Sequence, residues 1–149
     1  GFNYGARKFD RVLAAYRFTL RGAVCLLCVF SVVMIVWAPQ IVALFRSEDA
    51  VLVAIGARVL RWQSFVLPTA AVVTITNMLY QNIGKTLPAT FLAMMRQGLF
   101  FIPIVFVLPR FLGLDGVVTA QALADGLSFV AAVPFAIAIW RNLKAQIGK

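Results

Sequence analysis

The sequence predicts an all-α integral membrane protein with four antiparallel transmembrane helices. Of its 149 residues, 62% are hydrophobic and only 13% are charged, whereas soluble domains carry about 45–50% apolar and about 25% charged residues. The mean hydropathy is +0.93. The apolar residues also form long uncharged runs, and most basic residues stand at the ends of those runs. A chain of this kind has too little polar surface to cover a core in water, so it belongs in a lipid bilayer.

Four apolar blocks make up most of the chain, at about residues 22–45, 62–84, 86–109 and 116–140. As a helix, each block is long enough to cross the roughly 30 Å of hydrocarbon in a bilayer. The first two blocks carry no charge, the third contains Arg96, and the fourth contains Asp125. The connections are short, for example Gly84-Lys85, which favours antiparallel neighbours in contact. Residues 22–149 are therefore expected to form one four-helix transmembrane domain.

Residues 1–21 are expected to form a cytoplasmic loop followed by an amphipathic lead. Within residues 6–18 the apolar side chains share one helical face and two arginines lie on another: Phe9, Val12, Leu13 and Tyr16 against Arg7 and Arg11. A helix with these two faces is typical of a segment that lies along a membrane surface. We expect this lead to run into the first span.

The distribution of basic residues predicts the orientation. Nine of them share one side of the predicted bundle: Arg7, Lys8, Arg11, Arg17, Arg21, Lys85, Arg141, Lys144 and Lys149. Four lie on the opposite side: Arg46, Arg58, Arg61 and Arg110. Because Lys and Arg are retained on the cytoplasmic side, both termini are predicted to be cytoplasmic, in a multi-pass protein of the cell (inner) membrane.

Several function classes are disfavoured by composition. The net charge is +9, but the basic residues stand mostly at the ends of apolar runs. That placement orients helices in a membrane, so no nucleic-acid partner is expected. The chain has no His and no enzyme motif, so we expect no catalytic residues, no metal site and no cofactor. Cys25 and Cys28 lie in an apolar run, where they are interpreted as small apolar residues.

Arg96 and Asp125 are the two charges inside predicted spans, and each costs roughly 2.5–3.5 kcal/mol at mid-helix. Counted from the cytoplasmic ends, Arg96 lies about 15 Å deep and Asp125 about 22 Å deep. The two could pair across the third and fourth blocks, or Arg96 could extend to the interface. Asp125 could be a protonatable or cation-attracting site, or a hydrogen-bonded structural acid. The sequence leaves these alternatives open.

Two polar stripes follow a helical period. The second block carries Gln63, Ala70, Thr74, Asn77 and Gln81, with Pro68 freeing a backbone carbonyl nearby, and the fourth carries Gln121, Asp125, Ser128 and Ala132. Small and hydroxyl residues can simply permit close helix packing. Alternatively, the stripes line a water-filled cavity for a solute. The candidate residues of a substrate or ion pathway are Asp125, Arg96, Thr74, Asn77, Gln81, Gln121 and Ser128.

The opening residues, Gly-Phe-Asn-Tyr-Gly-Ala-Arg-Lys-Phe-Asp-Arg-Val, resemble the loop between the eighth and ninth helices of multidrug and toxic compound extrusion (MATE) transporters. The run from Tyr80 to Lys85, then Arg96-Gln97 and Ile102-Pro103, agrees in order and spacing. The resemblance implies that the four blocks are the ninth to twelfth helices of a twelve-helix protein. It also implies two six-helix bundles around a central cavity that exchanges H⁺ or Na⁺ for organic, often cationic, compounds. The implied partners are membrane lipid, small organic substrates and the remaining helices of the transporter.

Two departures from the family pattern qualify these expectations. The chain opens with Gly1 within the loop motif, so it resembles the last third of a transporter, and the family's acids in the first and seventh helices have no counterpart here. The carboxylate that some members carry in the tenth helix is also missing from residues 62–84. The coupling ion is left open, and the chain alone is expected not to transport.

Three other functions are compatible with parts of the pattern. A lipid-linked sugar flippase of the same superfamily would favour a more cationic cavity than Arg96 alone provides. A four-helix exporter of the small multidrug resistance type needs a glutamate in its first span, whereas Glu48 lies in a predicted loop. The third alternative is a truncated membrane fragment that transports nothing.

Overall fold

The computed structural model describes residues 1–45 and 49–148. The described part of the chain excludes residues 46–48, which belong to the predicted connection between the first two spans, and Lys149. It also excludes the side chain of Gln97. Within the described part, all regular structure is helical, which confirms the all-α class. The elements are α1 (Phe2–Gly5), α2 (Phe9–Val36), α3 (Ala38–Ala43), α4 (Ala50–Asn82), α5 (Thr86–Met94), the π-helix η1 (Met95–Leu99), α6 (Phe101–Leu112) and α7 (Leu114–Ile147).

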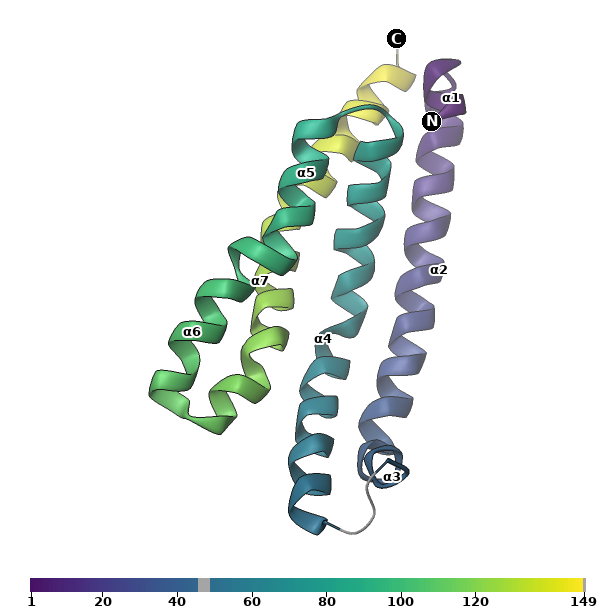
Figure 1. Ribbon diagram of the computed structural model, residues 1–149. Helices are drawn as coiled ribbons and strands as arrows, with labels where there is room; N and C mark the ends of the chain where they lie inside the picture. Colours follow the sequence, from purple (N-terminus) through teal and green to yellow (C-terminus); the bar gives the residue numbers. More distant parts are fainter. Residues whose placement is uncertain (46–48, 149) are drawn as a thin grey trace.

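Long helices run up and down the molecule (Figure 1). Among the described residues, three helices are long and apolar enough to cross a membrane, namely α2, α4 and α7. The segment α5–η1–α6 connects α4 to α7 along the chain and is interrupted at η1. Its second helix, α6, is too short to cross a membrane by itself. Both termini and the α4–α5 turn lie at one end of the bundle, and α3 lies at the other (Figure 1).

The first predicted span differs from the observed helices in both its bounds. The predicted amphipathic lead is continuous with α2, and its apolar residues Val12 and Leu13 are buried in the core rather than laid on a membrane surface. At the other end the helix breaks at Trp37. Pro39 follows, and a proline has no N–H to donate to the carbonyl four residues before it. That carbonyl belongs to Ile35, and it accepts a bond from Arg61 Nε of α4 at 3.4 Å.

The third predicted span is interrupted in its middle. In η1 the N–H of Phe100 donates to the carbonyl of Met95 at 3.1 Å, the i→i+5 bond of a π-helix. Pro103 disfavours an unbroken α-helix at this point because it has no N–H to donate to the carbonyl of Leu99. When α6 instead begins at Phe101, the proline falls in the first turn, where its missing donor costs nothing.

The helix that contains the second apolar block, α4, begins at Ala50, so residues 50–61 form its entry, as their amphipathic pattern predicts. Asp49 caps it, with Oδ1 accepting from the N–H groups of Val51 at 3.0 Å and Leu52 at 3.1 Å. Inside α4, Pro68 leaves the carbonyl of Ser64 without its helical donor. The hydroxyl of Ser31 in α2 donates to that carbonyl at 2.6 Å, so the freed group joins two helices.

The buried core lies in the half of the bundle that carries the termini. It joins α2, α4, α5 and α7 through Val12, Leu13, Val73, Tyr80, Ala89, Leu92, Ala132, Ile139 and Leu143. Many large apolar side chains elsewhere are exposed, including Val29, Phe65 and Phe106. An outward-facing apolar surface of this kind suits a lipid environment.

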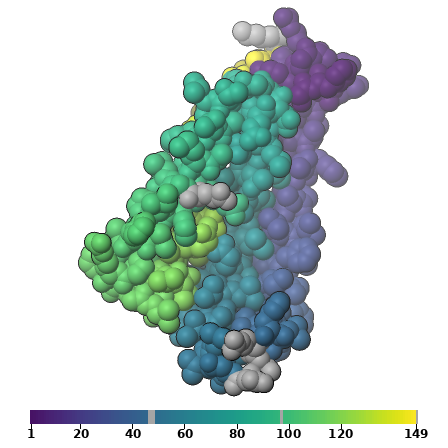
Figure 2. All heavy atoms as spheres, viewed as in Figure 1, coloured from purple at the N-terminus to yellow at the C-terminus, as the bar shows by residue number. Residues whose placement is uncertain are grey.

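The turn between α6 and α7 depends on two glycines. Gly113 has φ of 56°, a left-handed conformation that glycine adopts without strain. At Gly116 an added Cβ would come within 2.5 Å of the carbonyl oxygen of Leu108. The two helices therefore approach more closely here than any side chain would allow. In the space-filling view, the corner that they form projects to one side of the bundle (Figure 2), and Asp115 in it forms an ion pair with Arg58 of α4.

Candidate functional site

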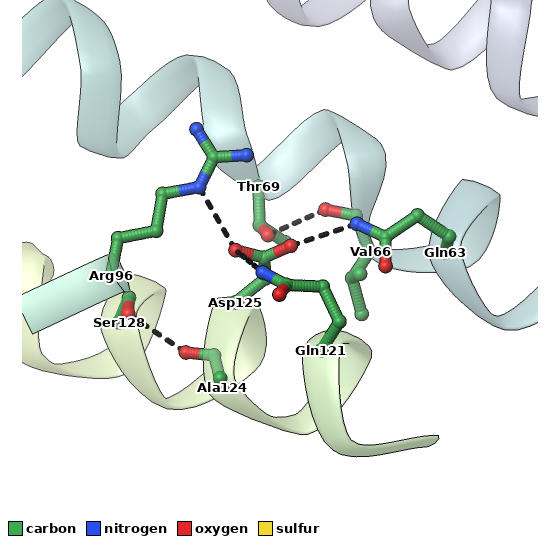
Figure 3. A network of polar contacts seen from close by, with 8 residues as sticks. All are labelled: Gln63, Val66, Thr69, Arg96, Gln121, Ala124, Asp125 and Ser128. Atoms are coloured by element: carbon green, nitrogen blue, oxygen red, sulfur yellow. Dashed lines mark hydrogen bonds and ion pairs between the residues drawn. The ribbon is translucent and has the colours of Figure 1, made fainter. Parts of the chain in front are cut away.

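Asp125 is the centre of a buried polar network that joins three helical elements (Figure 3). Its side chain is 3% exposed. Oδ1 accepts from Arg96 Nε of η1 at 2.9 Å and from Gln121 Nε2 of α7 at 3.3 Å. Oδ2 accepts from Gln63 Nε2 of α4 at 2.8 Å. Both carboxylate oxygens therefore have N–H donors, as a charge enclosed by helices requires.

The pairing of Arg96 with Asp125, one of the two alternatives left by the sequence, is the one that the structure adopts. The Arg96 side chain is 37% exposed, far more than that of Asp125. Only its Nε is bonded to the carboxylate, and its terminal nitrogens point away from Asp125 (Figure 3). Arg96 thus has one end in the buried network and the other at the surface of the bundle.

The outer part of Arg96 reaches a polar cavity between α4 and the α5–η1 segment. This cavity of about 260 Å³ is lined by Thr74, Asn77, Gln81, Arg96 and four apolar residues. It adjoins an open groove of about 660 Å³, which shares Gln81 and Ala93 with it and extends along Thr86, Thr90 and Met94. Here we call the two together the α4–α5 groove. Among its described lining residues, Arg96 is the one that carries a charge.

The two predicted stripes do not act as two walls of one cavity. The α4 stripe divides: Gln63 bonds to Asp125, whereas Thr74, Asn77 and Gln81 line the groove. The Nε2 of Gln81 donates to Asn77 Oδ1 at 3.3 Å, one turn away. The α7 stripe faces the interior, because Gln121 bonds to Asp125 and the fully buried Ser128 hydroxyl donates to the carbonyl of Ala124 at 2.7 Å.

The sequence reasoning missed the contribution of α5 to the groove. Thr86, Thr90, Ala93 and Met94 recur at i, i+4, i+7 and i+8, the spacing that places residues on one helical face. The spacing is visible in the sequence, but all four residues are uncharged, and helix packing alone also explains such a pattern.

The chemistry available in the groove is that of neutral hydrogen-bonding groups plus one guanidinium. Hydroxyls and amides can both donate and accept, so they suit water and varied polar solutes. Asp125 does not line the groove, and its charge is felt there only through Arg96, whose position it holds.

Comparison with known proteins gives the family. A family model described as MatE matches residues 1–107, which is 107 of the 149 residues. Neither the curated proteins nor the solved structures contain a match to the chain. The matched region covers α1 through η1 and about half of α6, and therefore contains all of the described groove residues. The chain belongs to the MatE family of membrane transporters.

Proposed function

We propose that the α4–α5 groove forms part of the solute pathway of a cation-coupled multidrug efflux antiporter. The observation that carries this proposal is the gathering of Thr74, Asn77, Gln81 and Arg96 on one open cavity, while many large apolar side chains are exposed elsewhere on the bundle. Polar side chains in a membrane bundle are costly unless they face water or protein. A solute pathway supplies that environment.

In this proposal the chain supplies four antiparallel spans, α2, α4, α5–η1–α6 and α7, to a larger bundle. The remaining helices of the transporter cover the groove, and the substrates are small organic, often cationic, compounds. H⁺ or Na⁺ is the coupling ion. Asp125 acts on the pathway by holding Arg96, since both of its oxygens are occupied by N–H donors.

A lipid-linked sugar flippase is the second candidate. The guanidinium of Arg96 at the groove is a group that binds phosphate well, which favours an anionic substrate. The neutral character of the other lining residues favours the drug antiporter.

Substrate protection of engineered cysteines distinguishes the candidates. In the intact transporter with Cys25 and Cys28 replaced, Asn77→Cys should react with a membrane-permeant maleimide, and a cationic dye should slow that reaction. Phe65→Cys, which is exposed on the apolar surface of the same helix, is the matched control and should not be protected. Protection of position 77 by a lipid-linked sugar and not by dyes would favour the flippase. Protection by neither would contradict the proposed pathway.

The chain expressed alone should confer no drug resistance, whereas the intact transporter should. Four helices of one bundle cannot enclose a cavity between two bundles. Dye efflux is compared at matched amounts of membrane-inserted protein. Efflux by the chain alone that depends on an ion gradient would contradict this expectation and revive a small dimeric exporter.

Both termini are proposed to be cytoplasmic, in the cell (inner) membrane. Cysteine at position 148 should be labelled only after permeabilisation of cells, and cysteine at position 47 should be labelled from outside. The nine-to-four division of basic residues is the reason. The opposite labelling pattern would reverse the topology.

A further inference from the structure

A second surface depression, on a different side of the bundle from the α4–α5 groove, is wholly apolar. It has a volume of about 330 Å³ and lies between α2, α4 and α7. Its walls include Leu20, Val72, Phe129, Val133 and Ile137. Tyr16 contributes its ring, since its hydroxyl is hydrogen-bonded at 3.0 Å to the buried Thr76. Here we call this depression the lipid groove.

One end of the lipid groove carries two cations. Trp140 closes the groove at the end nearer the termini. The guanidinium carbon of Arg17 lies 5.6 Å from the centroid of the indole ring, and Lys144 Nζ lies 5.0 Å from it. Both distances are within the range of cation–π attraction. Two side chains of like charge, from two different helices, therefore converge on a single ring.

Among the described residues, no carboxylate forms an ion pair with either of these two cations. In the part of the chain that the structure describes, the ion pairs are Arg58–Asp115 and Arg96–Asp125, neither of which involves Arg17 or Lys144. Both side chains are exposed. Repulsion between them would fall if an anion lay between them, so the cluster is electrostatically suited to a phosphate group.

We propose that this surface binds one anionic glycerophospholipid, with its phosphate at Arg17 and Lys144 and an acyl chain along the lipid groove. The groove follows α7 from Phe129 to Trp140, about 16 Å at the rise of an α-helix, which is the scale of an acyl chain. Basic clusters between helices at the membrane interface are typical sites for anionic lipid headgroups. The proposal does not depend on which solute the transporter carries.

The position along the helices agrees with a headgroup site. From Gly22 onward α2 carries no charge down to Val36, whereas Arg17 and Arg21 lie on the side of the termini. Arg17 therefore stands at the edge of the apolar stretch, where a lipid phosphate lies, and Trp140 occupies the interfacial level that indole rings prefer. The groove extends from there toward the middle of the bilayer.

Quenching of Trp140 by brominated lipids tests the proposal directly. The chain has three tryptophans, so Trp37→Phe with Trp62→Phe leaves Trp140 as the sole tryptophan, which is excited selectively at the red edge of tyrosine absorption. The full chain is reconstituted into phosphatidylcholine vesicles that contain equal mole fractions of either chain-brominated phosphatidylglycerol or chain-brominated phosphatidylcholine. We expect phosphatidylglycerol to be preferred about fivefold or more, the factor that corresponds to one interfacial cation.

Two variants define the site, and one is a matched control. Arg17→Gln with Lys144→Gln should reduce the preference to about onefold. Arg11→Gln with Lys85→Gln removes the same charge from the same end of the bundle and should leave the preference intact. Ala136→Phe keeps both cations but fills the groove, and should lower quenching by both brominated lipids, with helix content checked by circular dichroism.

Three results would overturn the proposal. One is equal quenching by the two lipids in the parent chain. Another is an equal loss of preference in the Arg11/Lys85 control, which would indicate general attraction of anionic lipid to a basic surface. The third is unchanged quenching in a folded Ala136→Phe variant, which would show that no acyl chain occupies the groove.

Discussion

Replacing Asp125 by Asn should destabilise the bundle, because it removes the charge that holds Arg96. Asn keeps the shape of the side chain, but its amide nitrogen cannot accept a hydrogen bond. In the parent, Gln63 donates to Oδ2, and Arg96 and Gln121 donate to Oδ1. Whichever of these two positions the amide nitrogen takes, the donors on that side would face another donor. Arg96 would also lose its counter-charge.

The size of the effect follows from the burial of the two partners. Breaking a fully buried ion pair by removing one member costs about 3–5 kcal/mol. Here the Asp125 side chain is 3% exposed but that of Arg96 is 37% exposed, so the stranded guanidinium can turn partly toward water. We therefore expect a loss of about 2–3 kcal/mol. For a chain of this length that loss corresponds to a fall in Tm of roughly 4–12 °C.

Thermal unfolding in detergent, followed by circular dichroism, measures this loss. The control is Asp115→Asn, which breaks the pair with Arg58 at side chains that are 62% and 57% exposed and should cost only about 0–1 kcal/mol. Arg96→Gln combined with Asp125→Asn should recover most of the lost stability, since no unpaired charge is left. The reasoning is refuted if Asp125→Asn melts with the parent, if Asp115→Asn loses as much, or if the double variant recovers nothing.

Two further predictions concern helix packing. Gly116→Ala should lower the free energy of unfolding by about 1–3 kcal/mol, because its Cβ would meet the carbonyl of Leu108. The control Gly126→Ala should not lower it, because nothing lies within 4 Å of that Cβ position. An equal loss in both variants would contradict the close approach of α6 and α7. Ser31→Ala should cost about 1–3 kcal/mol by leaving the carbonyl freed at Pro68 without a donor. In a Pro68→Ala background the N–H of residue 68 can donate to the Ser64 carbonyl, so the cost of Ser31→Ala should shrink. A double-mutant cycle measured by chemical denaturation tests this. An unchanged cost of Ser31→Ala would show that its bond to the freed carbonyl contributes nothing.

Much of the architecture could be predicted from properties that add up along the chain. Hydropathy summed over a block located the three helices that are long and apolar enough to cross a membrane, α2, α4 and α7. The fixed rise of a helix placed Arg96 and Asp125 within reach of each other. Pro68 marked a carbonyl that needed a donor, because the missing N–H is a property of the residue itself. The division of basic residues likewise matches the two ends of the bundle, with Lys85 at the turn beside the termini (Figure 1).

The breaks within helices could not be predicted, because whether a helix ends or continues depends on groups supplied by other helices. Pro39 permits a break before it, but the carbonyl of Ile35 is bonded by Arg61 from α4, and nothing in residues 22–45 reveals that donor. The same holds for η1. Pro103 disfavours a continuous helix, while the place of Arg96 within η1 is fixed by its bond to Asp125 on α7.

The sides of each stripe were also decided by tertiary structure. Helical periodicity placed Gln63, Thr74, Asn77 and Gln81 in one sector of α4, yet Gln63 faces α7 and the others face α5 and η1. One stripe can serve two neighbours because α7 and α5–η1 pass the same face of α4 at different heights. A period along one chain states which residues share a face, and only the packing of the other helices determines what that face contacts at each level.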